Sequence, residues 1–183
     1  MGAEPGGQAD LSVDLEARGG NRNFLQAADR AWALHQLALR KPMMLGLSPP
    51  CTMYSALMRM WNDHRMEPMT LAVRRAESDV LLEFAMICAK GQLFAGRRFY
   101  FEHPQTATSW TRAAVVHVLS LPGVFSVDFH QCAFGLKSPL GMPIRKATRL
   151  LTNSSGIRAR FEGKLCTCTV PHRRVEGSEG DIV

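Results

Sequence analysis

Residues 43–52 read MMLGLSPPCT, and this stretch decides the predicted fold. Its first five residues are all apolar, which is typical of a short strand buried in a parallel sheet. Pro49 and Pro50 then end the strand and restrict the backbone of the loop that presents Cys51. A thiol in such a loop is a nucleophile if nearby positive charge or a helix dipole lowers its pKa. Without such help, a lone cysteine is usually a small buried residue.

Helical and strand patterns alternate on both sides of this stretch. The predicted helices span residues 24–40, residues 69–92, and a third segment that Ser109 or Thr111 caps and Pro122 ends. The predicted strands span residues 11–15, 43–47, 98–101, 124–129 and 147–152. This order predicts an α/β protein with a three-layer, Rossmann-like core, in which helices cover both faces of a mainly parallel sheet. The apolar face expected for the long helix comprises Ala76, Val80, Leu81, Phe84, Ile87 and Cys88.

Length and composition limit the possible classes of protein. A chain of 183 residues with 46% hydrophobic and 21% charged residues suits one folded domain. We expect residues 1–10 to be disordered, residues 11–153 to form the α/β domain, and residues 154–183 to form a basic segment that contains cysteine and histidine. No stretch approaches the ~18 unbroken apolar residues of a membrane span, so we expect no membrane partner.

The charge and the cysteines suggest a compartment and a partner. The first ten residues, MGAEPGGQAD, lack the features of a secretory signal, and an odd number of cysteines, five, predicts reduced thiols. We therefore expect an intracellular protein, with the nucleus as one option. The net charge of +6 suits a polyanionic partner such as nucleic acid.

Reactive or polar residues end several of the predicted strands. Asp14, Cys51 and Glu102-His103 stand at the carboxyl ends of successive strands, where ligands bind in open α/β sheets. The carboxyl of Glu102 is placed to protonate or hydrogen-bond a substrate nitrogen, or else it is a solvated acid at a strand end. His103 is either an alternative acid or a surface residue.

Three segments carry a family resemblance. Residues 48–55, SPPCTMYS, resemble the Pro-Cys loop of DNA cytosine-5 methyltransferases, and residues 101–104, FEHP, resemble that family's Glu-Asn-Val strand end. Residues 131–135, QCAFG, and 145–153, RKATRLLTN, are similar to a pattern in compact phage-type members. Similar domains occur in retrotransposon-like polyproteins. The resemblance covers about residues 12–172.

The resemblance implies a function and roles for named residues. Cys51 would add to carbon 6 of cytosine, Glu102 would act on nitrogen 3, and Arg145 or Arg149 would orient the base or its phosphate. The other residues that would contact the substrate are Ser48, Thr52, Ser55, His103 and Lys146. The base would leave the duplex or arrive single-stranded. The basic side chains that would hold the DNA backbone are Arg145, Lys146, Arg149, Arg158, Arg160, Arg173 and Arg174, unless they form only a solvated basic face.

The implied methyl donor is S-adenosylmethionine. By resemblance, Asp14 would bind the ribose hydroxyls, Asn23 would face the adenine amino group, and Pro50 would contact the donor. The family's first strand and its glycine-rich turn are not recognisable, so we expect a methyltransferase core that lacks its first strand and an incomplete donor site. No separate target-recognition domain is visible.

The C-terminal segment contains a second set of candidate ligands. Cys166, Cys168 and His172 are suited to zinc, and Cys132 or His130 could supply a fourth ligand. The spacing C-x-C is less usual in zinc sites than C-x-x-C, so the sequence favours reduced cysteines without a bound metal.

Three hypotheses follow. The chain is a DNA cytosine-5 methyltransferase domain, a catalytically silent and truncated copy from a mobile-element polyprotein, or a nucleic-acid-binding module without chemistry. Amino-directed DNA methyltransferases, which carry an aromatic residue where Cys51 stands, are a more distant option. The sequence does not indicate an oligomeric state.

Overall fold

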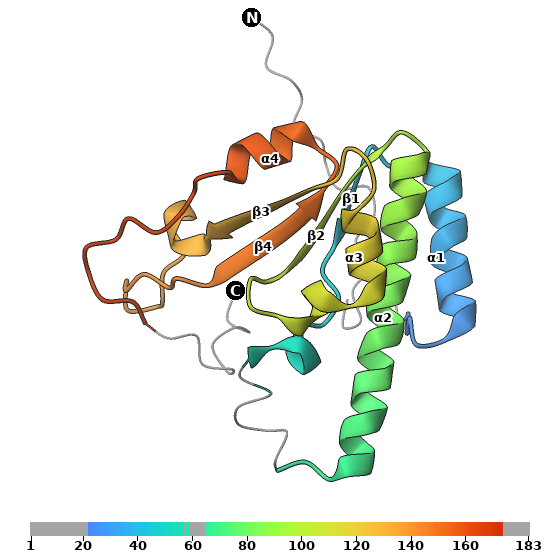
Figure 1. Cartoon of the computed structure of the whole chain (residues 1–183), viewed down its shortest axis with the longest axis horizontal. Coiled ribbons are helices and arrows are strands. Elements are labelled where there is room, and N and C mark those ends of the chain that lie inside the picture. Colours follow the sequence, from blue (N-terminus) through green and yellow to red (C-terminus); the bar gives the residue numbers. More distant parts are fainter. Residues whose placement is uncertain (1–21, 57, 59–64, 174–183) are drawn as a thin grey trace, which may run out of the picture. The chain divides into compact units, whose positions relative to one another are not determined.

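Within the residues described in the computed structural model (22–56, 58 and 65–173), four strands form one open sheet (Figure 1). The strands are β1 (Met44–Leu47), β2 (Arg98–Pro104), β3 (Phe125–His130) and β4 (Ala147–Thr152). Their order across the sheet is β1-β2-β4-β3. The four strands expected after residue 42 are thus present, and β2 continues through Glu102-His103-Pro104, which was expected to end it. The strand expected at residues 11–15 lies outside the described residues.

The direction of β4 corrects the expected sheet. β1 pairs with β2 in parallel, whereas β4 is antiparallel to both β2 and β3. The sheet is therefore mixed, and a Rossmann-like order is not established. The reason lies in the connection from β3 to β4, because parallel neighbours need a crossover, usually a helix. Residues 131–146 supply only the short 3₁₀ turn η4 (Gln131–Phe134).

Helices accompany the strands in nearly the expected places. They are α1 (Ala27–Arg40), α2 (Pro68–Phe94), α3 (Ala113–Leu119) and α4 (Ser155–Phe161), with 3₁₀ turns η1 (Thr52–Tyr54) and η3 (Thr108–Thr111). The cap expected for the third helix is wrong: Ser109 and Thr111 lie within η3, and Arg112 precedes α3. The sequence analysis also missed α4, which Ser154 caps by accepting a hydrogen bond from the Ile157 N–H.

Helices cover both faces of the sheet, as expected (Figure 1). On one face, α2 and α3 pack against Phe99, Phe101 and Leu151. On the other, α4 packs against Val127, Phe129 and Leu150. Consecutive residues such as Leu150 and Leu151 serve opposite faces because side chains alternate along a strand.

The buried face of α2 differs in part from the expected one. Phe84 and Cys88 are buried as expected, and burial raises the pKa of the Cys88 thiol to about 12. Ala76, Val80 and Ile87 are exposed instead. The buried residues that replace them include Leu82, Ala85, Met86 and Ala89. The helix is apolar over more than one face, so spacing alone did not select the face that meets the sheet.

The chain divides into two compact units, Met1–Met43 and Met44–Val183. The described part of the first unit contains α1, which ends at Lys41 in a left-handed conformation. The C-terminal segment belongs to the second unit, so residue 153 is not a boundary between compact units. None of the helices in the described residues is long and apolar enough to cross a membrane.

Buried polar side chains fix the register of β2 against β4. Asn153 is 5% exposed; its Oδ1 accepts the Phe99 N–H at 2.8 Å, and its Nδ2 donates to the Arg97 carbonyl at 2.7 Å. Thr152 donates its hydroxyl to the Phe99 carbonyl. These bonds hold the carboxyl end of β4 beside the start of β2. The other end of β4 is thereby placed beside Glu102 and His103.

Replacing Asn153 should therefore destabilise the sheet. In Asn153→Ala the buried Phe99 N–H loses its acceptor, which we expect to lower the free energy of unfolding by about 1–3 kcal/mol. The control is Ser126→Ala, at an exposed position of β3, with an expected change within about 0.5 kcal/mol. Urea unfolding measures both. Equal stabilities of the two variants would contradict the assigned role of Asn153.

Candidate functional site

The loop that carries Cys51 is held by contacts from other elements. The Pro49 carbonyl lies 2.9 Å from Nε2 of His103 in β2. The buried Tyr54 donates its hydroxyl to Asp79 of α2 at 2.8 Å. The Tyr54 N–H also donates to the Cys51 carbonyl at 3.0 Å, which closes the 3₁₀ turn. The thiol therefore sits on a braced turn.

His103 braces this loop from inside the protein. It is 1% exposed, and its Nδ1 lies 2.7 Å from the Ser109 hydroxyl. Because the Pro49 carbonyl can only accept, Nε2 carries the proton and Nδ1 accepts from Ser109. Burial lowers the pKa of His103 to about 4, so the ring is neutral at pH 7. His103 was expected to contact substrate, and in the structure both of its ring nitrogens are engaged within the protein.

Cys51 itself is only partly buried. Its backbone angles, φ −92° and ψ −2°, lie in the sparsely populated region where many active-site residues sit. Burial raises the pKa of the thiol above its ordinary value. The negative charge of Glu102 raises this pKa further, and the ammonium of Lys146 opposes both effects. The three groups are thus close enough for their charges to act on one another.

Glu102 points to the face of the sheet that α4 covers, because it stands opposite Leu150 in β4. Burial raises the pKa of its carboxyl, and Lys146 partly counteracts this shift. A larger fraction of Glu102 therefore stays protonated near neutral pH than of an ordinary glutamate. A protonated carboxyl is the form that can donate a hydrogen bond or a proton.

Lys146 reaches this place because β4 runs against its neighbours. It directly precedes β4, so it lies at the edge where β1 and β2 have their carboxyl ends. Its side chain is exposed, and its carbonyl accepts the Gln131 N–H at 3.3 Å. The sequence analysis placed Lys146 among the substrate contacts. The structure brings it together with Cys51 and Glu102.

Arg149 lies on the other face of the sheet from Glu102. It stands opposite His103 and Asp128 in the neighbouring strands. Its Nε and Nη2 donate to the two carboxylate oxygens of Asp128 at 2.6 and 2.8 Å. These hydrogen bonds lower the pKa of Asp128. A role for Arg149 in orienting the base or its phosphate stays a prediction; the structure separates its side chain from Glu102, because a one-residue step along a strand reverses the face.

Arg145 is exposed and close enough to His130 for its charge to lower that residue's pKa, although burial is the larger cause. Of the two candidate arginines, Arg145 is thus the one without a described ion pair. Of the other basic residues, Arg158 pairs with Glu162 at 3.1 Å, and Arg160 lies over the Phe134 ring. Arg174 lies outside the described residues.

Some of the smaller residues of the Pro-Cys loop are exposed to solvent, and one of them forms hydrogen bonds within the turn. Ser48, Pro50 and Thr52 are exposed beside Cys51 and accessible to a ligand. Ser55 donates its hydroxyl to the Thr52 carbonyl and accepts the Met58 N–H, at 3.0 and 3.1 Å. These bonds give Ser55 a role in shaping the turn.

The residues expected to bind S-adenosylmethionine do not form a site that can be described. Asp14 lies outside the described residues. Asn23 belongs to the first unit, where its Oδ1 accepts the Leu25 N–H at 3.0 Å and its own N–H donates to Asp29 at 2.8 Å. Pro50, on the second unit, is exposed. Asn23 and Pro50 thus lie in different units, so no donor site is described and no step is derived through the donor.

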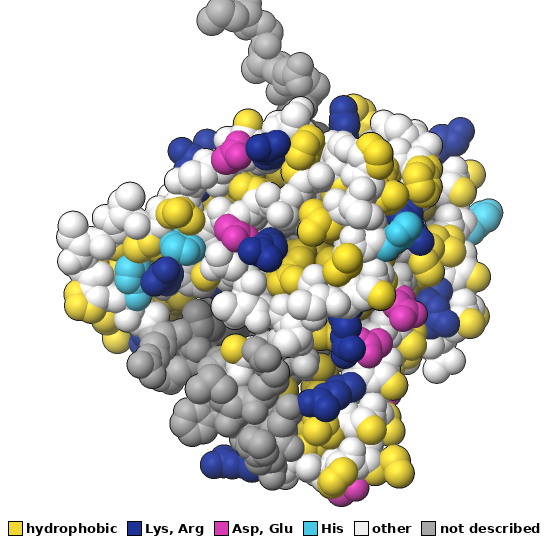
Figure 2. Space-filling view, viewed as in Figure 1, with side chains coloured by type: hydrophobic (Ala, Val, Ile, Leu, Met, Phe, Trp, Pro, Cys, Tyr) yellow, Lys and Arg dark blue, Asp and Glu magenta, His cyan; other side chains and the backbone are white. Residues whose placement is uncertain are grey.

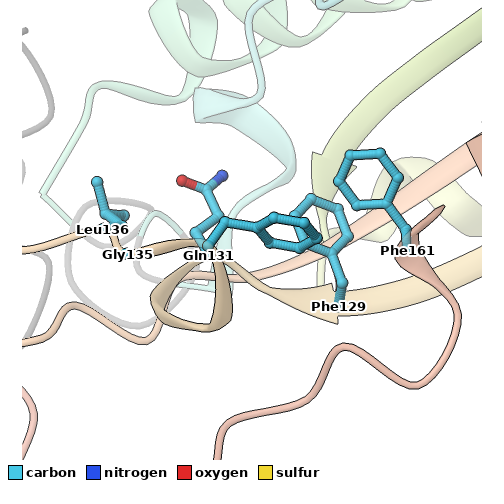
Figure 3. Close-up of a pocket in the computed structure, with 6 residues that line it drawn as sticks. Phe129, Gln131, Gly135, Leu136 and Phe161 are labelled. Atoms are coloured by element: carbon cyan, nitrogen blue, oxygen red, sulfur yellow. The ribbon is translucent and has the colours of Figure 1, made fainter.

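Two cavities flank the loops of the second unit. One of about 480 Å³ is lined by Phe129, Phe134 and Phe161 together with Gln131, Gly135 and Leu136. Figure 3 shows the Phe129 and Phe161 rings next to each other, with Gln131 and Leu136 beyond them. The other, of about 280 Å³, includes Met53 of η1 with Arg75 and Arg112. The first of these is open to solvent rather than enclosed, and its lining is mainly apolar.

Basic side chains do not form a single stripe on the face shown in Figure 2. Lys and Arg are scattered there in small groups, several of them beside an Asp or Glu. The interpretation of these residues as a solvated basic face therefore suits this side of the molecule.

Comparison with known proteins adds no relative: no family model, no curated protein and no solved structure matches this chain.

Charge changes around Cys51 should alter its reactivity in opposite directions. Lys146→Gln removes the cation that favours the thiolate, so alkylation of Cys51 at pH 8 should slow roughly two- to fivefold. Glu102→Gln removes the opposing charge and should accelerate it by a similar factor. Peptide mass spectrometry after iodoacetamide pulses measures both. The control is Lys137→Gln, which replaces an exposed lysine of the loop that carries Lys146. Equal alkylation rates in the wild type and the three variants would contradict the proximity of Cys51, Glu102 and Lys146.

Buried His103 should also make stability depend on pH. Its pKa is lower in the folded state than in the unfolded chain, so its contribution is complete above about pH 6.5 and is lost as pH falls towards 4. We expect this group to cost about 2 kcal/mol between pH 7.5 and pH 5. Urea unfolding at the two pH values should show a smaller loss in His103→Gln. His117→Gln, at an exposed position, should retain the full loss.

Proposed function

We propose that the second unit adds the Cys51 thiolate to carbon 6 of a cytosine, as the first half of a cytosine-5 methyltransferase reaction on DNA. The observation that carries the proposal is the convergence of a thiol, a carboxyl with a raised pKa and an ammonium at one edge of the sheet. Each of the three groups has a function in this chemistry. Cys51 follows β1, Glu102 lies near the end of β2, and Lys146 directly precedes β4.

The addition begins with ionisation of the thiol. The Cys51 proton goes to solvent, and the Lys146 ammonium stabilises the thiolate. A carbon–sulfur bond forms at carbon 6, and the electrons of the 5,6 double bond shift into the ring. Protonated Glu102 donates its proton to nitrogen 3, which prevents negative charge from accumulating there. Carbon 5 is then enamine-like and nucleophilic.

Two different groups can be added to carbon 5: a methyl group, which requires the donor, or a proton, which does not. S-adenosylmethionine would supply the methyl group for carbon 5, and no described residue is assigned to that transfer. In its absence, carbon 5 can take a proton from solvent. Loss of the original carbon 5 proton to solvent, departure of the thiolate and return of the nitrogen 3 proton to Glu102 then restore cytosine, with its hydrogen exchanged. This exchange needs only Cys51, Glu102 and a bound base.

DNA is the proposed polyanionic partner, with the target base extruded or single-stranded. Support comes from the net charge of +6 and from exposed Arg145 and Lys146 at the edge that carries Cys51. Exposed Ser48 and Thr52 extend the polar surface around the thiol. An intracellular location, with the nucleus as one option, is the setting that suits this substrate.

Hydrogen exchange tests the proposal without the donor. We expect the wild type to release tritium from DNA that contains [5-³H]cytosine and Cys51→Ser to release none. Glu102→Gln should lower the rate by on the order of 10²-fold or more, whereas Glu77→Gln, at an exposed position of α2, should not change it.

A second arm, DNA with 5-fluorocytosine plus S-adenosylmethionine, tests methyl transfer. Exchange without a covalent adduct identifies a truncated copy with an intact nucleophile. Salt-dependent DNA binding without exchange refutes the chemistry and indicates a non-catalytic nucleic-acid-binding module.

A further inference from the structure

Four potential metal ligands meet at the end of β3. The ligand atoms of Cys132, Cys166, Cys168 and His172 all lie within 4.8 Å of one another. Cys166 Sγ is 3.1 Å from His172 Nε2, and the Cys168 N–H donates to Cys166 Sγ at 3.4 Å. Cys132 comes from η4, more than thirty residues before the other three. The sequence pattern named these residues, but only the fold selects Cys132 over His130 as the fourth.

Hydrogen bonds that do not involve the ligand atoms position the C-terminal segment of this cluster, residues 164–173. The His130 N–H donates to the Lys164 carbonyl, and the Cys166 N–H donates to Nδ1 of His130, each at 2.9 Å. At the other end, the Arg173 N–H donates to the Pro143 carbonyl at 3.0 Å. His130 is thereby occupied in supporting the backbone of Cys166. One flank of the segment is thus tied to the last residue of β3, and the other flank is tied to the loop after β3.

Apolar burial does not explain why residues 164–173 are ordered. The large hydrophobic side chains of this segment, Leu165 and Val170, are 50% and 54% exposed. Ordering a ten-residue segment costs conformational entropy that must be offset by some favourable interaction. A metal bound by several side chains provides such an interaction in small, poorly buried segments. Three of the four ligands lie within residues 164–173, the segment whose apolar burial is small.

The donor set agrees with zinc. Three thiolates and one imidazole form a usual tetrahedral set for structural zinc, with no position left for substrate. Ligands at ordinary zinc distances lie roughly 3.5–3.8 Å apart. The separations in the cluster, from 3.1 Å between Cys166 Sγ and His172 Nε2 up to 4.8 Å, bracket that value, so a small rearrangement completes the geometry. A disulfide is the competing explanation, but all five cysteines are free, and any pair would leave a third sulfur unused.

We propose that Cys132, Cys166, Cys168 and His172 bind one Zn²⁺ in a structural site. On binding, the three thiols release their protons, and His172 coordinates through Nε2. The metal fastens residues 164–173 to η4. It also restrains the loop 135–146, which is hydrogen-bonded to the segment through Pro143 and ends at Lys146. This inference does not depend on the proposed cytosine chemistry.

Metal content tests the proposal on the full chain. Protein purified under reducing conditions should contain about one zinc per chain by inductively coupled plasma mass spectrometry. Cys168→Ser and His172→Ala should lose most of it. The matched controls, Cys51→Ser and His117→Ala, should keep it. Cobalt substituted for zinc should give the intense visible bands of a tetrahedral site and a thiolate charge-transfer band in the near ultraviolet.

Differential alkylation of the wild type tests the site without any variant, so it remains informative if a variant fails to fold. In the wild type, added Zn²⁺ should slow alkylation of Cys132, Cys166 and Cys168 at least tenfold and leave Cys51 unchanged. Any one of three results would overturn the site: a folded, reduced, zinc-reconstituted chain without metal, zinc that the Cys168 and His172 variants retain, or a disulfide among the three cysteines in a non-reducing peptide map.

Discussion

The candidate site depends on one topological constraint, the reversed strand β4 between β2 and β3. Because β4 runs opposite to its neighbours, its first residues lie at the edge where β1 and β2 end. Lys146 thus joins Cys51 and Glu102, although it lies 95 positions after Cys51 in the sequence. The bonds of Asn153 and Thr152 to β2 hold this register. A shift of one residue would send the Glu102-facing side chains of β4 to the opposite face.

The electrostatics of the site join two requirements of the proposed reaction. Burial opposes ionisation of the Cys51 thiol and also raises the pKa of Glu102, which favours its protonated form. A protonated Glu102 carries no charge, so it does not raise the pKa of the thiol. The carboxyl proton of Glu102 therefore has two effects. It is the proton that nitrogen 3 requires, and while it is bound it removes the negative charge that would oppose formation of the Cys51 thiolate. Lys146 favours both ionised forms, and its exposure to solvent moderates the effect.

Polar contacts position the loops at the carboxyl edge. The Pro-Cys loop is held by His103 and Tyr54, whose polar groups contact Pro49 and Asp79. The loop after β3 is bonded through Lys146 at one end and through Pro143 to the C-terminal segment. A metal at the cysteine cluster would add rigidity where hydrophobic packing is sparse. Loops carried on a rigid sheet are a common arrangement for binding and catalysis.

Local sequence determined most elements and the candidate nucleophile. The apolar run before Pro49 and Pro50 predicted β1 and its loop, and periodicity predicted α1, α2 and the other strands. The identity of Cys51 and Glu102 as a candidate pair also came from the sequence. Only tertiary structure decided the direction of β4, because strand direction depends on pairing rather than on composition. It moved Arg149 into an ion pair with Asp128, buried His103, and selected Lys146 and Cys132, since these outcomes depend on contacts between residues far apart in the chain.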